Sequence, residues 1–174
     1  MQSLICFIGL GSNQHDPKLQ LENAIKALID LPKSRFIAHS NFYQSSPLAY
    51  PNSNQEKPAD YLNAVVKMET RLLPFELLRQ LQQIELTQGR IRESDNRWAS
   101  RTLDLDILLY ADTVIQTQQL IIPHYAMRQR DFVLKPLLEM VKEYIFQDGV
   151  QASDLLQQCD NNNLKKLEGT SKNL

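Results

Sequence analysis

The chain has 174 residues, of which 43% are hydrophobic, and its 19 Lys and Arg against 20 Asp and Glu give a formal net charge of -1. This near-neutral charge gives no electrostatic reason for a nucleic-acid or membrane-surface partner, and no apolar run approaches the ~20 residues that span a bilayer. The two cysteines form neither a disulfide framework nor a zinc-ligand cluster, and the N-terminus lacks a signal-peptide pattern, so we expect one cytoplasmic domain over residues 1–174.

The pattern of apolar residues, prolines and glycines predicts alternating strands and helices. Strands are expected where short runs are apolar or alternate, and helices where apolar residues recur every three or four positions. The expected strands are 4–10, 36–46, 61–70, 103–110 and 119–122, and the expected helices are 17–31, 74–88 and 130–141. Two long polar loops, 47–59 and 90–101, lie between them, and the polar tail from about residue 151 is expected to fray at its end.

The order of the first four strands and two helices indicates the fold class. Strand, helix, strand, strand, helix and strand follow one another as in the ferredoxin-like α+β sandwich. We therefore expect an antiparallel sheet with helices packed on one face. The other face would remain for additional elements or for a ligand.

The fourth of these strands carries the clearest chemical signal. Asp104 and Asp106 alternate along it, so both side chains face one side of the sheet, while Leu103, Leu105 and Ile107 pack on the other. Two neighbouring carboxylates repel one another unless a cation lies between them, and hard oxygen ligands suit Mg²⁺. An Asp-x-Asp pair alone is more often a solvated strand face than a metal site.

Positively charged residues precede the acidic pair. They are Arg90, Arg92, Arg97 and Arg101, all in the second long loop. Acidic metal ligands flanked by arginines are what a polyphosphate with bound Mg²⁺ requires, although any one of these arginines alone would be interpreted as a solvated loop residue. Trp98, the only tryptophan, lies among them and can either anchor the loop or stack on a planar heterocycle.

A second polar cluster lies at 124–132, after the fifth strand. His124, Tyr125, Arg128 and Arg130 can each donate hydrogen bonds to phosphate oxygens, and Phe132 follows them. No serine or cysteine triad signature accompanies them. The chain also has neither a Walker A segment nor a complete Gly-x-Gly-x-x-Gly, so phosphates would be held by side chains and metal.

Taken together, these motifs resemble the 6-hydroxymethyl-7,8-dihydropterin pyrophosphokinase family. The strongest of them is the run Arg-Trp-Ala-Ser-Arg-Thr-Leu-Asp-Leu-Asp at 97–106, and the others, in the expected order, are 11–13, 43–48, 60–64, 84–86, 89–90 and 123–125. The resemblance implies the ferredoxin-like fold. It also implies transfer of pyrophosphate from ATP to the hydroxymethyl group of the pterin, which gives AMP, in folate biosynthesis.

The resemblance further implies roles for single residues. Asp104 and Asp106 would bind two Mg²⁺ ions. The residues implied for the pterin are Ser45, Leu48, Tyr61, Asn63, Trp98 and Phe132. Those implied for ATP are Gln82, Glu85, Arg92, Arg101, His124, Tyr125 and Arg130, and those implied for catalysis are Arg90, Arg92, Arg101 and Asp106. The partners would be these two small molecules, bound by a monomer.

Two other interpretations remain open on the residues alone. A ferredoxin-like module that binds RNA or a regulatory nucleotide without catalysis would present aromatic residues on its sheet, but Asp104 and Asp106 would repel a phosphate backbone without metal. A metal-dependent phosphohydrolase could use the same acidic pair. The residues implied for the pterin argue against a hydrolase only through the resemblance.

Overall fold

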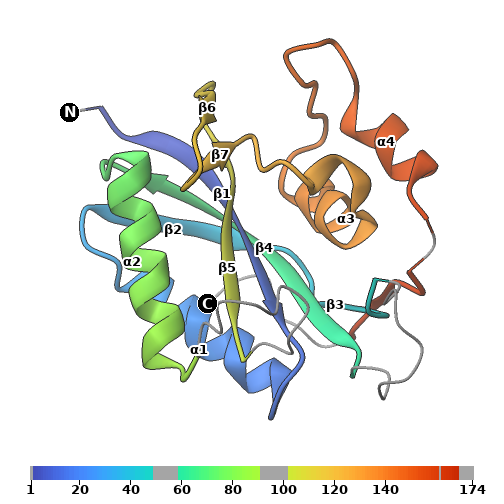
Figure 1. Ribbon diagram of the computed structural model, residues 1–174, viewed down its shortest axis with the longest axis horizontal. Coiled ribbons are helices and arrows are strands. Elements are labelled where there is room, and N and C mark those ends of the chain that lie inside the picture. The colour runs from blue at the N-terminus through green and yellow to red at the C-terminus, as the bar shows by residue number, and fades with distance from the viewer. Residues whose placement is uncertain (1, 49–58, 91–101, 161, 169–174) are drawn as a thin grey trace.

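The computed structural model describes residues 2–48, 59–90, 102–160 and 162–168 (Figure 1). Its centre is a six-stranded sheet in the order β5-β1-β4-β3-β8, with β2 also paired to β4. The strands are β1 (Leu4–Ser12), β2 (Ser34–His39), β3 (Tyr43–Ser45), β4 (Tyr61–Thr70), β5 (Asp104–Tyr110), β6 (Ile115–Gln116), β7 (Ile121–Ile122) and β8 (Lys165–Lys166). The helices are α1 (Pro17–Ile29), α2 (Pro74–Thr87), the 3-10 helix η1 (Met127–Gln129), α3 (Asp131–Met140) and α4 (Ala152–Gln158).

The strand pairing confirms the predicted fold class. All neighbours in the central sheet are antiparallel, with β1 between β5 and β4 and with β2 and β3 on the far side of β4. This is the arrangement that the order of the first four expected strands indicates. β6 and β7 form a separate two-stranded hairpin, so the short fifth strand lies outside the central sheet.

The prediction of one continuous strand over 36–46 is wrong. The segment forms β2 and β3, which both pair with β4 and are separated at residues 40–42. Ser40 explains the break, because its hydroxyl accepts a hydrogen bond from the Val65 backbone N–H at 2.9 Å while its own N–H donates to the Val65 carbonyl at 2.8 Å. A side chain thus replaces a backbone acceptor of the ladder, and the strand cannot continue in register.

One face of the sheet is covered by α1 and α2, as Figure 1 shows. Both helices begin at a proline, and the Asp16 carboxylate caps α1 by accepting from the Leu19 N–H at 3.1 Å. The core beneath them contains side chains from β1, β5 and both helices, among them Ile8, Leu21, Leu28, Leu81 and Leu105.

The opposite face is covered only in part, by α3 and α4 (Figure 1). There Phe7, Val65 and Leu108 of the sheet pack against Leu134 and Leu137 of α3 in a second core. The part of this face that α3 leaves open is where the alternating polar side chains of β4 and β5 lie, and it positions the site described below. Among the described residues, no helix is both long and apolar enough to cross a bilayer.

The C-terminal tail forms more structure than its sequence indicates. Its pattern predicts no element, yet α4 packs on α3, and β8 pairs with β3, Lys166 opposite Tyr43. The Leu167 N–H also donates to the Phe42 carbonyl at 2.9 Å. The fraying expected at the end of the tail concerns residues after 168, which lie outside the described residues.

Candidate active site

A cavity opens between the sheet and the start of α3. Its floor is formed by side chains that alternate along the strands, including Asn63 of β4 and Asp104 and Asp106 of β5. Its walls come from the segment 45–48 on one side and from Arg130, Phe132 and Val133 on the other. The period of two along each strand therefore places the predicted acidic pair on one surface with Tyr61 and Asn63 of β4.

Two glycines of β1 keep this floor open. Gly11 pairs with Asp104, and Gly9 pairs with Asp106. A Cβ atom at Gly9 would lie 3.2 Å from a methyl group of Leu108, and one at Gly11 would lie 3.6 Å from the Asn63 amide oxygen. A larger side chain at either position would therefore enter the cavity. Glycines at alternate positions of an apolar strand were the available signal, and the predicted site did not include them.

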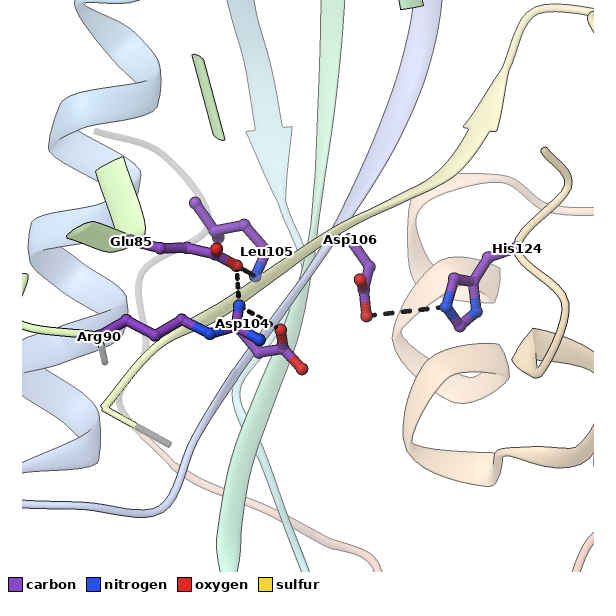
Figure 2. Close-up of polar contacts among 6 residues, drawn as sticks. All are labelled: Glu85, Arg90, Asp104, Leu105, Asp106 and His124. Atoms are coloured by element: carbon purple, nitrogen blue, oxygen red, sulfur yellow. Dashed lines mark hydrogen bonds and ion pairs between the residues drawn. The ribbon is translucent and has the colours of Figure 1, made fainter. Parts of the chain in front are cut away.

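Asp104 is held by a buried charge network (Figure 2). The Arg90 guanidinium contacts the Asp104 carboxylate at 2.6 Å and also pairs with Glu85. Glu85 is only 1% exposed, and its carboxylate accepts a second hydrogen bond from the Leu105 backbone N–H at 2.8 Å. Glu85 therefore links helix α2 to the start of β5 and orients Arg90 toward the acidic pair.

Asp106 faces His124 from the other side of the cavity (Figure 2). His124 Nε2 lies 3.8 Å from an Asp106 carboxylate oxygen, which is beyond hydrogen-bond distance. Burial of the imidazole and the charge of Arg130 lower the pKa of His124 to about 4, against an opposing effect of Asp104. At neutral pH His124 is therefore uncharged, and its contact with Asp106 is not an ion pair.

The amide of Asn63 is fixed by the adjacent strand. Asn63 is 5% exposed, and its Nδ2 donates to the Tyr43 carbonyl at 3.2 Å and to the Ser45 hydroxyl at 3.0 Å. Both amide hydrogens are thus used within the protein. The amide oxygen is the atom with which Asn63 can accept a hydrogen bond from a ligand.

The donor set suits a metal that brings other ligands with it. Among the described residues, no group of three or more His, Cys, Asp or Glu side chains is placed to hold an ion. Asp104 and Asp106 supply carboxylates alone, on alternate residues of one strand. Mg²⁺ usually binds through one or two carboxylates and completes its coordination with water and substrate phosphates, so the pair fits that ion better than one that requires a full protein cage.

The residues that the resemblance implies for the site differ in whether they line the cavity. Ser45, Leu48, Tyr61, Asn63, Asp104, Asp106, His124, Arg130 and Phe132 line it. Gln82, Glu85, Arg90 and Tyr125 are not among its lining residues, and Tyr125 is 68% exposed, its ring beside that of His124. Arg92, Trp98 and Arg101 lie outside the described residues.

The fold and the cavity define a class of protein, an α+β domain whose antiparallel sheet presents a pair of carboxylates beside cationic and aromatic side chains. Comparison with known proteins narrows the class. The sequence model of the 7,8-dihydro-6-hydroxymethylpterin-pyrophosphokinase family matches residues 7–142. The chain belongs to this family.

Two curated relatives extend over nearly the whole chain. The 2-amino-4-hydroxy-6-hydroxymethyldihydropteridine pyrophosphokinase of Haemophilus influenzae is 43% identical over 164 residues, which cover 94% of this chain and 98% of the relative. The protein of the same name from Pseudomonas aeruginosa is 40% identical over 166 residues, covering 94% and 96%. The solved Plasmodium falciparum HPPK-DHPS with pteroate is 14% identical with a TM-score of 0.69; the match covers 90% of this chain and 44% of that one, and it shows the fold.

Proposed function

We propose that the cavity between the sheet and α3 is where the chain carries out the reaction of its family. That reaction is the transfer of pyrophosphate from ATP to the hydroxymethyl group of 6-hydroxymethyl-7,8-dihydropterin, giving AMP and the pterin pyrophosphate in folate biosynthesis. The observation that carries the proposal is that Asn63, Asp104 and Asp106 line one cavity. A fixed amide and a pair of metal ligands suit a heterocyclic acceptor and a polyphosphate donor.

The sheet side of the cavity suits the pterin. The amino group and the adjacent ring N–H of a 2-amino-4-hydroxypteridine are donors, and the Asn63 amide oxygen is an acceptor whose orientation Tyr43 and Ser45 fix. Tyr61 and Phe132 supply aromatic side chains to the same cavity, and a flat ring packs well on aromatic faces. Trp98 would add a further aromatic face from outside the described residues.

The acidic pair suits the phosphates. Asp104 and Asp106 would hold Mg²⁺, and we propose two ions. Mg²⁺ held by these carboxylates would supply positive charge that neutralises the phosphates of ATP. Arg90 contributes by holding the Asp104 carboxylate in place, whereas Arg130 lines the cavity and brings a permanent positive charge to the phosphates.

His124 is suited to donate a hydrogen bond rather than to provide charge. Its pKa of about 4 keeps the ring neutral at pH 7, and Nε2 faces the cavity toward Asp106. With its proton on Nε2, His124 would donate a hydrogen bond to a phosphate oxygen of ATP. The nearby Asp106 carboxylate is the candidate acceptor for the proton of the pterin hydroxyl.

These positions suit a direct transfer between the two substrates. The oxygen of the pterin hydroxymethyl group forms a bond to the β-phosphorus of ATP, the bond from that phosphorus to the α-phosphate oxygen breaks, and AMP leaves. No covalent intermediate with the protein is required. Most of the acceleration would come from placing the two substrates in line and from stabilising charge on the transferred group.

The remaining proposals concern the protein as a whole. We propose that residues 1–174 work as one monomeric domain with small-molecule partners and without nucleic acid or membrane. Both cysteines are free, which agrees with work in the reducing cytoplasm.

A product assay tests the proposed function. The protein is incubated with ATP, Mg²⁺ and the dihydropterin, and AMP is separated from ADP. We expect AMP that depends on the pterin, and at least about a hundredfold lower turnover in Asp104→Asn and Asp106→Asn, because each loses a metal-ligand charge. Asp148→Asn, at a surface ion pair with Arg128, is the matched control. Wild-type turnover in both site variants would refute the assignment of the acidic pair.

A further inference from the structure

The C-terminal segment 162–168 connects the two walls of the cavity through hydrogen bonds of Asn162. Asn162 donates its side-chain amide to the Asp131 carboxylate at 2.8 Å and its backbone N–H to the other oxygen at 3.3 Å. The Asn162 carbonyl accepts a hydrogen bond from the Ser46 backbone N–H at 2.8 Å. One residue thus binds the first residue of α3 and the segment that follows β3.

Both ends of this connection lie directly beside cavity-lining residues. Asp131 is 7% exposed and accepts a further hydrogen bond from the Phe132 N–H at 2.7 Å, and Phe132 lines the cavity. Ser46 lines the cavity itself, next to Ser45, which holds the Asn63 amide. A shift of Asn162 would therefore move a side wall relative to the floor.

The segment is held in register by the sheet. β8 adds a strand to β3, and Figure 1 shows the red segment that follows α4 returning beside β3. The Leu167 side chain packs against the main core, and its N–H bonds to the Phe42 carbonyl. Residues 162–168 also lie beyond residues 7–142, which the family model matches.

The other end of α3 is tied to the sheet independently. Glu139 accepts hydrogen bonds from the Asn41 backbone N–H at 2.7 Å and from the Tyr43 hydroxyl at 2.6 Å. Those bonds fix the C-terminal half of the helix. The N-terminal half, which carries Phe132, is connected to the β3 side through Asn162.

We propose that Asn162 is a positioning residue that sets the separation between Phe132 and the wall at 45–48, and through it the affinity for the pterin. The inference rests on the proposed function, which places the pterin between these walls. Asn162 is not among the residues that line the cavity. It acts through the Asp131 carboxylate and the Ser46 backbone, whereas the acidic pair belongs to β5.

Steady-state kinetics on the full chain test the inference. We expect Asn162→Ala to raise the KM for the dihydropterin about tenfold and the KM for ATP by no more than about threefold, because Arg130 lies on the displaced wall while the acidic pair proposed for the Mg²⁺-bound phosphates stays in place on β5. Asn162→Asp, which sets two carboxylates against one another, should raise the pterin KM further. The exchanged pair Asp131→Asn with Asn162→Asp restores an amide facing a carboxylate and should return the pterin KM to within about threefold of the wild type.

Two reference variants separate the possible failures. Asp148→Asn removes an ion pair in the C-terminal part of the chain without touching the cavity walls, and its pterin KM should remain that of the wild type.

Phe132→Ala tests the pterin site itself. If Phe132→Ala raises the pterin KM while both Asn162 variants do not, the inference is wrong and the proposed site stands. If Phe132→Ala leaves the pterin KM unchanged, the proposed site is wrong and the inference with it. Equal rises in the KM for pterin and ATP, or no recovery in the exchanged pair, would also overturn the positioning role.

Discussion

The buried carboxylate of Glu85 offers the sharpest test of how the acidic pair is held. In Glu85→Gln the shape of the side chain is kept, and the amide oxygen can still accept from the Leu105 N–H, which lies 2.8 Å from the carboxylate in the wild type. What is lost is the charge that pairs with Arg90. The two side chains are 2% and 12% exposed, so solvent screens this pair little.

The expected cost follows from the partners that remain. Removing one member of a buried ion pair costs ~3–5 kcal/mol when the other charge is left alone. Arg90 keeps its contact with Asp104 at 2.6 Å, so its charge is not left without a partner. We therefore expect the free energy of unfolding to fall by about 1.5–3 kcal/mol, the range of a hydrogen bond to a charged group. Against a typical total of ~5–15 kcal/mol, the variant should fold and the loss should be measurable.

Urea unfolding in the presence of a chelator measures this loss without interference from bound metal. Glu69→Gln is the matched control, because it breaks another Glu–Arg pair, with Arg35, whose guanidinium side chain is 70% exposed. Water screens such a surface pair, so its loss should change the stability far less. In a second assay, the Mg²⁺ concentration for half-maximal turnover should rise in Glu85→Gln, because Arg90 then competes more strongly with Mg²⁺ for the Asp104 carboxylate. A Glu85→Gln variant as stable as Glu69→Gln would refute the reasoning.

Two further predictions concern titration. The pKa of His124 is about 4 in the folded chain, below its ordinary 6.5, so the unfolded chain binds the proton more readily between these values. The contribution of His124 to the free energy of unfolding is therefore fully present above pH 6.5. It is lost as the pH falls from 6.5 through 4, and the total loss is about 3 kcal/mol. Urea midpoints at several pH values with a chelator present should fall less with acid in His124→Gln, and an equal fall would contradict the assignment. Burial raises the pKa of the Cys6 thiol to about 12, so Cys6 should react with a thiol reagent only after unfolding; rapid labelling of Cys6 in the native protein, identified by mass spectrometry of peptides, would show that it is not buried.

The sequence predicted the parts of the fold that depend on local signals, namely the spacing of apolar and polar residues and the position of prolines. Alternation along β5 placed Asp104 and Asp106 on one face, and prolines marked the starts of α1 and α2. The break at Ser40 was not predictable in this way. It depends on the hydrogen bond between the Ser40 hydroxyl and Val65, a residue that is near only after β4 has paired.

The C-terminal tail shows the same limit. β8 has two residues, and its pattern of charge and polarity carries no strand signal. It is a strand because the edge of β3 is available to pair with it. The pairing with β3 therefore makes this segment a strand, and the local pattern of apolar and polar residues does not.

Glu85 is an intermediate case, because its sequence did contain a signal. It follows Leu77 and Leu81 at intervals of four, on the face of α2 that is buried against the sheet. A glutamate in an apolar stripe must find a charged partner inside the protein. The resemblance assigns Glu85 to ATP, which stays a prediction, and the structure adds its contacts with Arg90 and the backbone of Leu105.

The charge network also bears on why this site would take ATP together with Mg²⁺. Arg90 lies between Glu85 and Asp104, so these three side chains together carry a single negative charge, and Asp106 adds another. His124 contributes no charge at neutral pH, because its pKa is about 4. Among the described residues, these groups make the floor of the cavity negative, and Arg130 is the cation of its lining. Under the proposed function, one Mg²⁺ ion on the acidic pair would neutralise these two negative charges and the second would make the floor positive, so the same carboxylates that disfavour free ATP would favour its Mg²⁺ complex.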